Sequence, residues 1–344
     1  MSFKRLDAED LVVSADSITA TLWSTNVPIQ TEFFTSSVQA SGTSGNFYIN
    51  IYQTSSTDPS ATTQFNIAYG NKYGSGSLDY TTGVYGKSPT STIYGQFQNL
   101  ILGDENTDFN FNGITKTDFY TITFDRQRFK EKLFPGSLNL KLTSGSTTIQ
   151  LTDNSEDVTS ITFTEAGRVF QIVSGSNGSA IASATSATSS IAAGMTISGS
   201  YGLFLPDIGT IILNASALDL PTNRGGLALG TVRGSNTNNN NNTRLYSVIS
   251  QSAYFKINSE ETITSDFVFI RARNAEFNYS ENPSFISSSQ GTVIYDSFIN
   301  NPQTFVTTIG LYNDTNELLA VAKLSKPLKK DFTKEALIRV KLDF

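Results

Sequence analysis

The stretch NLKLTSGSTTIQLTD, residues 139–153, has the pattern that decides the fold class of this chain. Apolar and polar side chains alternate on both sides of a Ser-Gly-Ser turn, which is the outline of a β-hairpin. The stretches GNFYINIYQT (45–54) and TQFNIAYGN (63–71) alternate in the same way around a polar loop, so we expect them to pair. Several such units at this spacing suggest a sandwich or a barrel, and we predict an all-β fold with antiparallel, sandwich-type domains.

Composition narrows the chemistry that the chain can perform. Its 344 residues include no cysteine and no histidine. A disulfide framework, a thiol nucleophile, a Cys/His zinc site and a Ser-His-Asp triad are therefore excluded. The formal net charge of −6 gives no overall basic footprint for nucleic acid, and no apolar stretch has the length of a membrane span. We predict neither nucleic-acid nor membrane partners.

Few stretches suggest a helix. Residues 126–132, RQRFKEK, are the best candidate for a short one, because Pro135 and Gly136 follow as stop signals. We interpret GQFQNLILGDENTDFNFNG, residues 95–113, as a strand followed by an acidic loop. The region after residue 244 returns to aromatic and branched residues at strand spacing.

Two low-complexity stretches guide the predicted domain organisation. Residues 174–200 are mostly small, and residues 233–243 contain an asparagine run, so both are predicted to be loops. We expect an N-terminal β domain with an ordered arm at 1–135. We also expect a β-rich middle module at 136–243, which is inserted into this domain or adjoins it. The remaining C-terminal β segment, 244–344, is expected to pack with the N-terminal domain.

Acidic clusters give no convincing catalytic or metal site. The pairs Asp104-Glu105 and Glu260-Glu261 are adjacent in sequence, and neighbouring strand residues point to opposite faces, unlike the facing acids of a glycosidase. The groups around Asp314 and Asp153 lack the glycine and the distal glutamate of a calcium loop. We assign no catalytic, cofactor-binding or metal-binding residue.

The C-terminal region combines a predicted hairpin with clusters of basic residues. In IGLYNDTNELLAVAKLSKPLKKDF, residues 309–332, the polar residues 313–317 predict a hairpin turn between two buried strands. A lysine cluster follows, and FVFIRARN (267–274) places two arginines on one face of a strand. We predict inter-subunit contacts at Lys326, Lys329, Lys330, Lys334, Arg271 and Arg273. The alternative is that these charged side chains simply face solvent.

Five longer stretches carry a resemblance to a known family. They are FKRLDAEDLVVSADSITATLWST (3–25), RQRFKEKLFPGSLNLKL (126–142), EAGRVFQIVSGSNGS (165–179), INSEETITSDFVFIRARNAEFNYSENPSF (257–285) and TTIGLYNDTNELLAVAKLSKPLKKDFTKEALIRVKLDF (307–344). These stretches resemble virion structural proteins of large contractile-tailed bacteriophages, notably those that infect marine cyanobacteria. The resemblance runs along nearly the whole chain.

The resemblance implies a non-enzymatic particle component, made in the host cytoplasm and placed in the virion, most plausibly in the tail or baseplate region. Its expected partners are other phage structural proteins and copies of itself. A receptor-binding or glycan-binding protein of the tail periphery is an alternative, and aromatic residues such as Trp23 suit sugar stacking. A neck or capsid-associated protein and a tail-associated glycan hydrolase are further alternatives.

Overall fold

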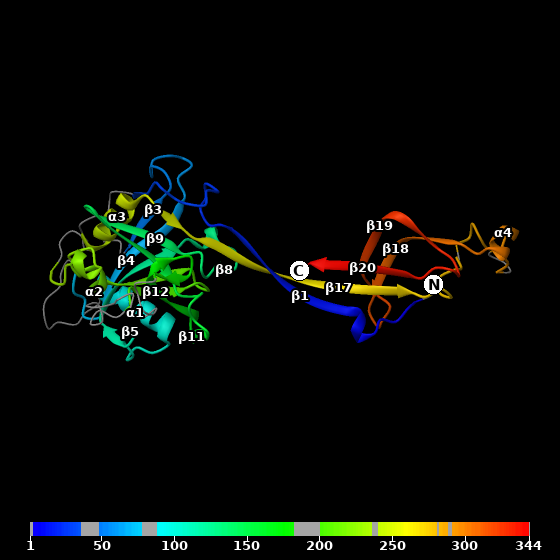
Figure 1. Ribbon diagram of the computed structural model, residues 1–344, viewed down its shortest axis with the longest axis horizontal. Helices are drawn as coiled ribbons and strands as arrows, with labels where there is room; N and C mark the ends of the chain where they lie inside the picture. Colours follow the sequence, from blue (N-terminus) through cyan, green and yellow to red (C-terminus); the bar gives the residue numbers. More distant parts are fainter. Residues whose placement is uncertain are drawn as a thin grey trace. The chain divides into compact units, whose positions relative to one another are not determined.

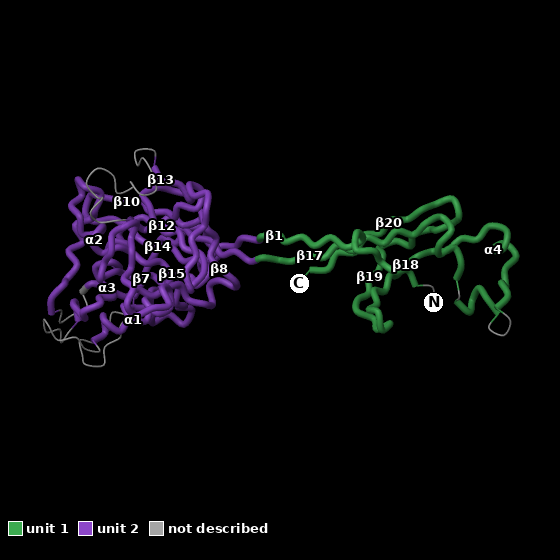
Figure 2. Tube along the Cα trace, turned by 90° about the horizontal axis from the view of Figure 1, so that it is seen from below, with its two compact units in different colours: residues 1–17, 262–344 green, residues 18–261 purple. Residues whose placement is uncertain are grey.

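The chain forms two compact units, which are drawn in different colours in Figure 2. Unit 2 comprises residues 18–261, and unit 1 comprises residues 1–17 together with residues 262–344. The computed structural model describes residues 3–35, 48–77, 88–181, 200–235, 240–280, 282–287 and 291–343. Phe47, most of the small-residue stretch and part of the asparagine run lie outside these ranges.

Unit 2 is built on one long antiparallel sheet that curls strongly into a half-barrel (Figure 1). The predicted all-β, antiparallel class is therefore confirmed. In spatial order the strands are β16 (Phe255–Lys256), β9 (Asn139–Ser144), β10 (Thr147–Asp153), β12 (Gly167–Ser176), β14 (Gly202–Leu205), β15 (Thr210–Asn214), β7 (Asp118–Phe124), β4 (Thr63–Asn71), β3 (Tyr48–Tyr52) and β2 (Phe34–Thr35). The short strands β11 (Thr162–Thr164) and β13 (Ser179–Ala180) pair with β12.

The sequence predicted two of these strand pairs correctly. Strands β9 and β10 form the hairpin expected at 139–153, and Gly145 takes the positive φ of 60° that its turn requires. Strands β3 and β4 pair as expected, with Ile49 opposite Ile67 and Ile51 opposite Phe65. In β3 the alternation matches the burial, because Ile49 and Ile51 are buried and their neighbours are more exposed. Strand β4, in contrast, is buried along most of its length on both faces.

The predicted boundary at residues 135/136 does not separate two modules in this structure. Strands from both sides of it belong to the same sheet, since β15 pairs directly with β7. Residues 18–135 and 136–261 therefore share one core, and the middle module is part of unit 2.

Both faces of the curled sheet are covered. On one face Tyr120, Ile122 and Phe124 of β7 join a large buried cluster, whereas Phe119 of the same strand joins a second cluster on the other face. The first cluster contains Trp23, whose ring lies edge-to-face with Phe65, Phe124 and Phe255 at centroid distances of 5.2–6.3 Å. Trp23 is 1% exposed, so the only tryptophan is a core residue and does not face a ligand.

Two helices occupy stretches that we had expected to be strand or loop. Helix α1 (Pro89–Leu102) replaces the strand expected from residue 95 and packs its Tyr94 ring against Phe119 at 5.2 Å. Its signals are Pro89 near the N-terminus and Gly103 in the left-handed conformation at the C-terminus. Helix α3 (Asn240–Ser252) begins inside the asparagine run and buries Leu245, Val248 and Ile249.

The remaining elements of unit 2 are short. The helix expected at 126–132 is a single 3-10 turn, Arg126–Arg128, followed by β8 (Lys132–Leu133), which pairs with β17 (Asn258–Ala272). Helix α2 (Ala215–Leu218), a 3-10 turn at Thr222–Arg224 and the hairpin of β5 (Phe109–Phe111) and β6 (Ile114–Lys116) complete the unit.

In unit 1 the end of β17 lies between two other strands. Strand β1 (Leu11–Thr21), preceded by a 3-10 turn at Ala8–Asp10, lies on one side of β17, and β20 (Ala336–Asp343) pairs with the other side. A separate hairpin joins β18 (Thr304–Tyr312) to β19 (Leu318–Lys330), and a short helix, α4 (Asp296–Asn300), precedes it.

A polar network in unit 2 connects residues 219–233 to strand β7. The Asp118 carboxylate accepts hydrogen bonds from the Tyr69 hydroxyl at 3.0 Å and from Arg233 Nε at 2.7 Å, and Arg233 Nη1 lies 2.7 Å from Asp219 Oδ2. Burial alone lowers the pKa of Arg233, but these two carboxylates outweigh it and raise the pKa. Burial, and then the charge of Asp118, raise the pKa of Tyr69. Arg233 is therefore the residue that neutralises a buried carboxylate.

We expect Arg233→Met to lower the free energy of unfolding by about 2 kcal/mol, because Asp118 then keeps only the tyrosine hydroxyl as a partner in this network. Urea denaturation measures the change. Adding Asp118→Asn should recover part of it, because the uncompensated charge is removed. Lys130→Met is the matched control: its ion pair with Glu261 is exposed, so the change should stay within about 0.5 kcal/mol. Equal losses in both variants would contradict this role.

Candidate interaction surface of unit 1

Unit 1 contains very little buried apolar surface. Both clusters of buried apolar side chains in the described residues lie between Leu22 and Ile257, which is within unit 2. The buried apolar side chains of unit 1 are Val268, Ala272, Phe298, Ala336 and Val340. A unit of this size normally needs a far larger apolar core to offset the entropy lost on folding. Most of the apolar side chains of unit 1 in the described residues are therefore exposed or only half-buried.

The hairpin of β18 and β19 confirms one prediction and contradicts another. Its turn lies at residues 313–317 as expected: the Asn313 side-chain oxygen accepts the backbone N–H groups of Thr315 and Glu317, and Asn316 has a φ of 61°. The two strands, however, are not buried. Their side chains are exposed or half-buried along their length, and only Lys330 is fully buried.

An apolar patch covers part of one face of this hairpin. It consists of Phe3, Tyr312, Leu318 and Val321, all of which are exposed. The Phe3 and Tyr312 rings meet edge-to-face at 5.2 Å. Tyr312 and Leu318 lie over Gly310, where a Cβ would come within 2.8 Å of the Tyr312 ring. Because a two-stranded hairpin is marginally stable by itself, we interpret this patch as a contact surface.

Phe305 and Leu319 extend the exposed apolar surface of the hairpin. They are 61% and 68% exposed, and Phe305 lies opposite Lys329 in the strand register. Apolar side chains of both strands and the lysines of β19 thus share the surface of the hairpin. Contact surfaces have an apolar centre and a polar rim, so the contiguous apolar side chains are the part of this surface that would suit a protein contact.

The structure places most of the predicted contact residues at the surface. Lys326 is exposed on β19, and Lys334 is exposed in the turn before β20. Lys329 is half-buried, with its ammonium 3.9 Å from Asp331 Oδ2. Arg271 is exposed on β17, and Arg273 is exposed just beyond the end of that strand. Their role in contacts between subunits stays a prediction.

Lys330 requires a correction, because its side chain is 0% exposed. Its ammonium donates three hydrogen bonds: to the Asn274 carbonyl oxygen at 2.9 Å, to Asn278 Oδ1 at 2.8 Å and to the Asp331 carbonyl oxygen at 3.0 Å. A buried ammonium group is tolerated when all of its N–H groups are bonded, as they are here. Lys330 therefore holds the end of β19 in place and cannot serve as an exposed docking residue.

The turn at residues 273–278 gathers distant parts of unit 1. Glu276 accepts hydrogen bonds from the Arg273 backbone N–H at 2.8 Å and from the Lys4 ammonium at 3.0 Å. These bonds, the first being the stronger cause, lower the pKa of Glu276. The Lys4 ammonium also donates to the Arg271 carbonyl oxygen, and the Thr304 hydroxyl donates to the Phe277 carbonyl oxygen. Polar bonds to this turn take the place of a larger core.

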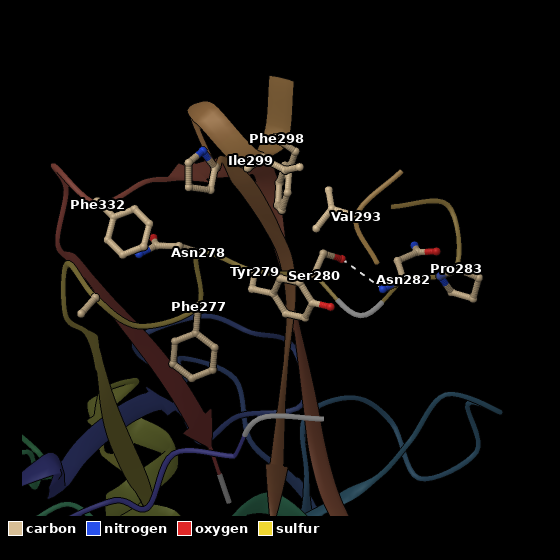
Figure 3. Close-up of a pocket in the computed structure, with 12 residues that line it drawn as sticks. Phe277, Asn278, Tyr279, Ser280, Asn282, Pro283, Val293, Phe298, Ile299 and Phe332 are labelled. Atoms are coloured by element: carbon tan, nitrogen blue, oxygen red, sulfur yellow. Dashed lines mark hydrogen bonds between the residues drawn. The ribbon is translucent and has the colours of Figure 1, made fainter. Parts of the chain in front are cut away.

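A depression of about 1090 Å³ lies beside this turn in unit 1 (Figure 3). Its lining has no charged side chain and includes the aromatic residues Phe277, Tyr279, Phe298 and Phe332. Figure 3 also shows Ser280 between Tyr279 and Asn282, and the Ser280 hydroxyl accepts a hydrogen bond from the Asn282 backbone N–H at 3.3 Å. Aromatic faces beside amide groups suit an uncharged ligand that offers both hydroxyls and an apolar face.

Other functional classes receive no support from the geometry of the described residues. In them, no group of three or more Asp and Glu side chains is arranged to hold a metal ion. None of the described helices is long and apolar enough to cross a membrane. The acidic residues at 104–105 lie in an exposed loop, where Asp104 bonds to Asn106 and Thr107, and these bonds lower the pKa of Asp104.

Comparisons with known proteins place the chain in no family. No protein-family model matches it, and searches of curated proteins and of solved structures likewise found no match. The functional argument therefore depends on the residues and the geometry described above.

We expect Lys330→Met to destabilise the hairpin, because three acceptors, of which Asn278 Oδ1 is buried, lose their donor at a cost of about 2–3 kcal/mol. Hydrogen exchange followed by mass spectrometry should show faster exchange in peptides from residues 304–330, with exchange in unit 2 unchanged. Lys329→Met is the matched control, since Lys329 keeps only one long contact to Asp331. Unchanged exchange in Lys330→Met would show that these bonds do not hold the hairpin.

Proposed function

We propose that this chain is a non-enzymatic structural subunit of a bacteriophage virion, located in the tail or baseplate region. The observation that carries the proposal is the small buried core of unit 1 in the described residues, together with its exposed apolar patch and the exposed lysines of β19. Such a unit gains most of its stability when neighbouring proteins cover it, as in the permanent contacts of an assembly. The sequence resemblance to tail-region proteins of contractile-tailed phages supports the same role.

The composition adds a second line of support. A chain without cysteine and histidine lacks the residues of the commonest catalytic centres, and its rigid half-barrel in unit 2 can serve as a platform. A neck or capsid-associated position is an alternative within the same class, because apolar patches and lysine clusters serve contacts equally well anywhere in a particle. The position of the protein in purified particles, determined by electron cryomicroscopy, decides between these places.

We expect the double variant Lys326→Glu and Lys329→Glu to enter phage particles less efficiently, because the reversed charges oppose an acidic neighbouring surface. Complementation of a phage that lacks the wild-type gene, followed by mass spectrometry of purified particles, measures this. Lys116→Glu with Lys130→Glu makes the same change of charge on unit 2 and is the control. Wild-type chain that is absent from purified particles would refute the proposed function itself.

A second candidate function is supported by the depression in unit 1, which has an uncharged, aromatic lining. A receptor-binding or glycan-binding protein of the tail periphery would use such a site for neutral sugars, with aromatic faces stacking on sugar rings. Trp23 no longer supports this alternative, because it is buried in unit 2.

If the depression binds sugars, Tyr279→Ala with Phe332→Ala should abolish signals on a glycan array, because both rings are exposed at the site. Tyr295→Ala is the matched control: Tyr295 is also exposed in unit 1 but does not line the depression. A wild-type chain that binds no glycan on the array, or a double variant that binds normally, would remove this candidate.

A further inference from the structure

The sheet of unit 1 has two open edges. Strands β1 and β20 lie on opposite sides of β17, and among the described residues no further strand pairs with the outer side of either. Open edges expose unpaired backbone N–H and C=O groups, which can pair with a strand of another chain. Strand β20 contains 8 residues, and the part of β1 that belongs to unit 1, residues 11–17, contains 7, so both edges are long enough for such pairing.

The edge formed by β20 is basic and apolar. Leu337, Arg339 and Lys341 alternate along it on the more exposed face, and Leu337 is 63% exposed. No described carboxylate lies within salt-bridge distance of Arg339, whose guanidinium stands over the Phe267 ring at 5.3 Å. Lys341 contacts Asp343 at 2.9 Å, and both side chains are about half exposed. The β20 edge therefore offers at least one arginine with no anionic partner.

The edge formed by β1 has the opposite character. Asp16 lies on the strand, and Asp7 and Glu9 lie just before it; all three are exposed, and no described lysine or arginine forms a salt bridge with them. Val12 and Val13 are exposed on the same strand, at 48% and 62%. An acidic and apolar edge thus complements the basic and apolar edge of β20.

These two edges cannot satisfy each other within one chain. Two strands that share a neighbour are separated by two strand spacings, about 10 Å, so β17 keeps β1 and β20 apart. Pairing of like edges between copies is also unfavourable. Two β20 edges would bring Arg339 and Lys341 together, and two β1 edges would bring carboxylates together. Only an unlike pair, β20 of one copy beside β1 of another, joins opposite charges.

We propose that unit 1 assembles head-to-tail with a second copy of this chain, the β20 edge of one copy adding to the β1 edge of the next. Backbone hydrogen bonds supply the main attraction, and the opposite charges select the partner edge. Such a contact joins two different surfaces, so it continues into a ring or an open helical stack. This contact gives the proposed virion subunit a partner, a second copy of itself, and so rests on the proposed function.

The test uses the purified full-length chain in sedimentation equilibrium at low and high salt. The wild type should self-associate, and more weakly at high salt. Arg339→Glu with Lys341→Glu, and separately Glu9→Lys with Asp16→Lys, should each weaken association about tenfold or more, since like charges then face each other. Lys116→Glu with Lys130→Glu makes the same change of charge on unit 2, away from both edges, and is the control; it should associate as the wild type does.

Mixing the two edge variants is the decisive step. Each variant alone presents like charges at the contact, whereas an alternating mixture restores opposite charges at every contact. Association should therefore return in the mixture and in a chain that carries all four substitutions. Circular dichroism melts show whether each variant is folded, and the mixture remains informative where a single variant is destabilised.

Several results would overturn the inference. They are a wild-type chain that stays monomeric up to its solubility limit, edge variants that associate normally, a mixture that does not recover, or a unit 2 control that is equally weakened. The outcome is separable from that of the proposed function. A chain present in phage particles but monomeric in solution contradicts only the head-to-tail contact, and a self-associating chain absent from particles contradicts only the virion role.

Discussion

Unequal burial of apolar side chains is the constraint on which the rest of this structure depends. Unit 2 covers both faces of its curled sheet, with the aromatic cluster around Trp23 and Phe65 on one face and helix α1 on the other. Unit 1 has no comparable cluster in its described residues, although it carries exposed phenylalanine, leucine and valine side chains. Burial of such side chains by a neighbouring protein would contribute about 25 cal/mol for each Å² removed from water. Unit 2 is therefore the better packed of the two units, and in the proposed assembly role unit 1 would gain the larger share of newly buried apolar surface.

Polar bonds explain how unit 1 keeps a defined structure before any partner is present. Lys330 donates two of its three hydrogen bonds to the turn at 273–278. Lys4 bonds to Glu276 in the same turn and to the Arg271 carbonyl oxygen just before it. These bonds fix the ends of β17 and β19. Directional bonds of this kind specify geometry, whereas apolar burial mainly supplies free energy. The hairpin can thus present its exposed side chains in a fixed arrangement with little core beneath them.

Local patterns in the sequence predicted those structural features that are determined by residues close together in the chain. The hairpin at 139–153, the pairing of β3 with β4 and the turn at 313–317 follow from alternation and turn residues, and all three are present. Helix α1 was missed although Pro89 and Gly103 mark its ends, because the aromatic residues between them also suit a strand. The buried state of Lys330 was not predictable, since its acceptors, Asn274 and Asn278, are more than 50 residues away in sequence.

The treatment of sheet edges differs between the two units, and the difference supports an assembly role for unit 1. The long sheet of unit 2 ends in β2 and β16, each only two residues long, and short edge strands are a common protection against unwanted pairing. Unit 1 instead leaves the much longer β1 and β20 at its edges. The charges on these strands disfavour pairing of β1 with β1 and of β20 with β20 between copies. The edges are therefore exposed but favour pairing with an edge of opposite charge. A chain under pressure only to stay monomeric would be expected to shorten or cover them, as unit 2 does.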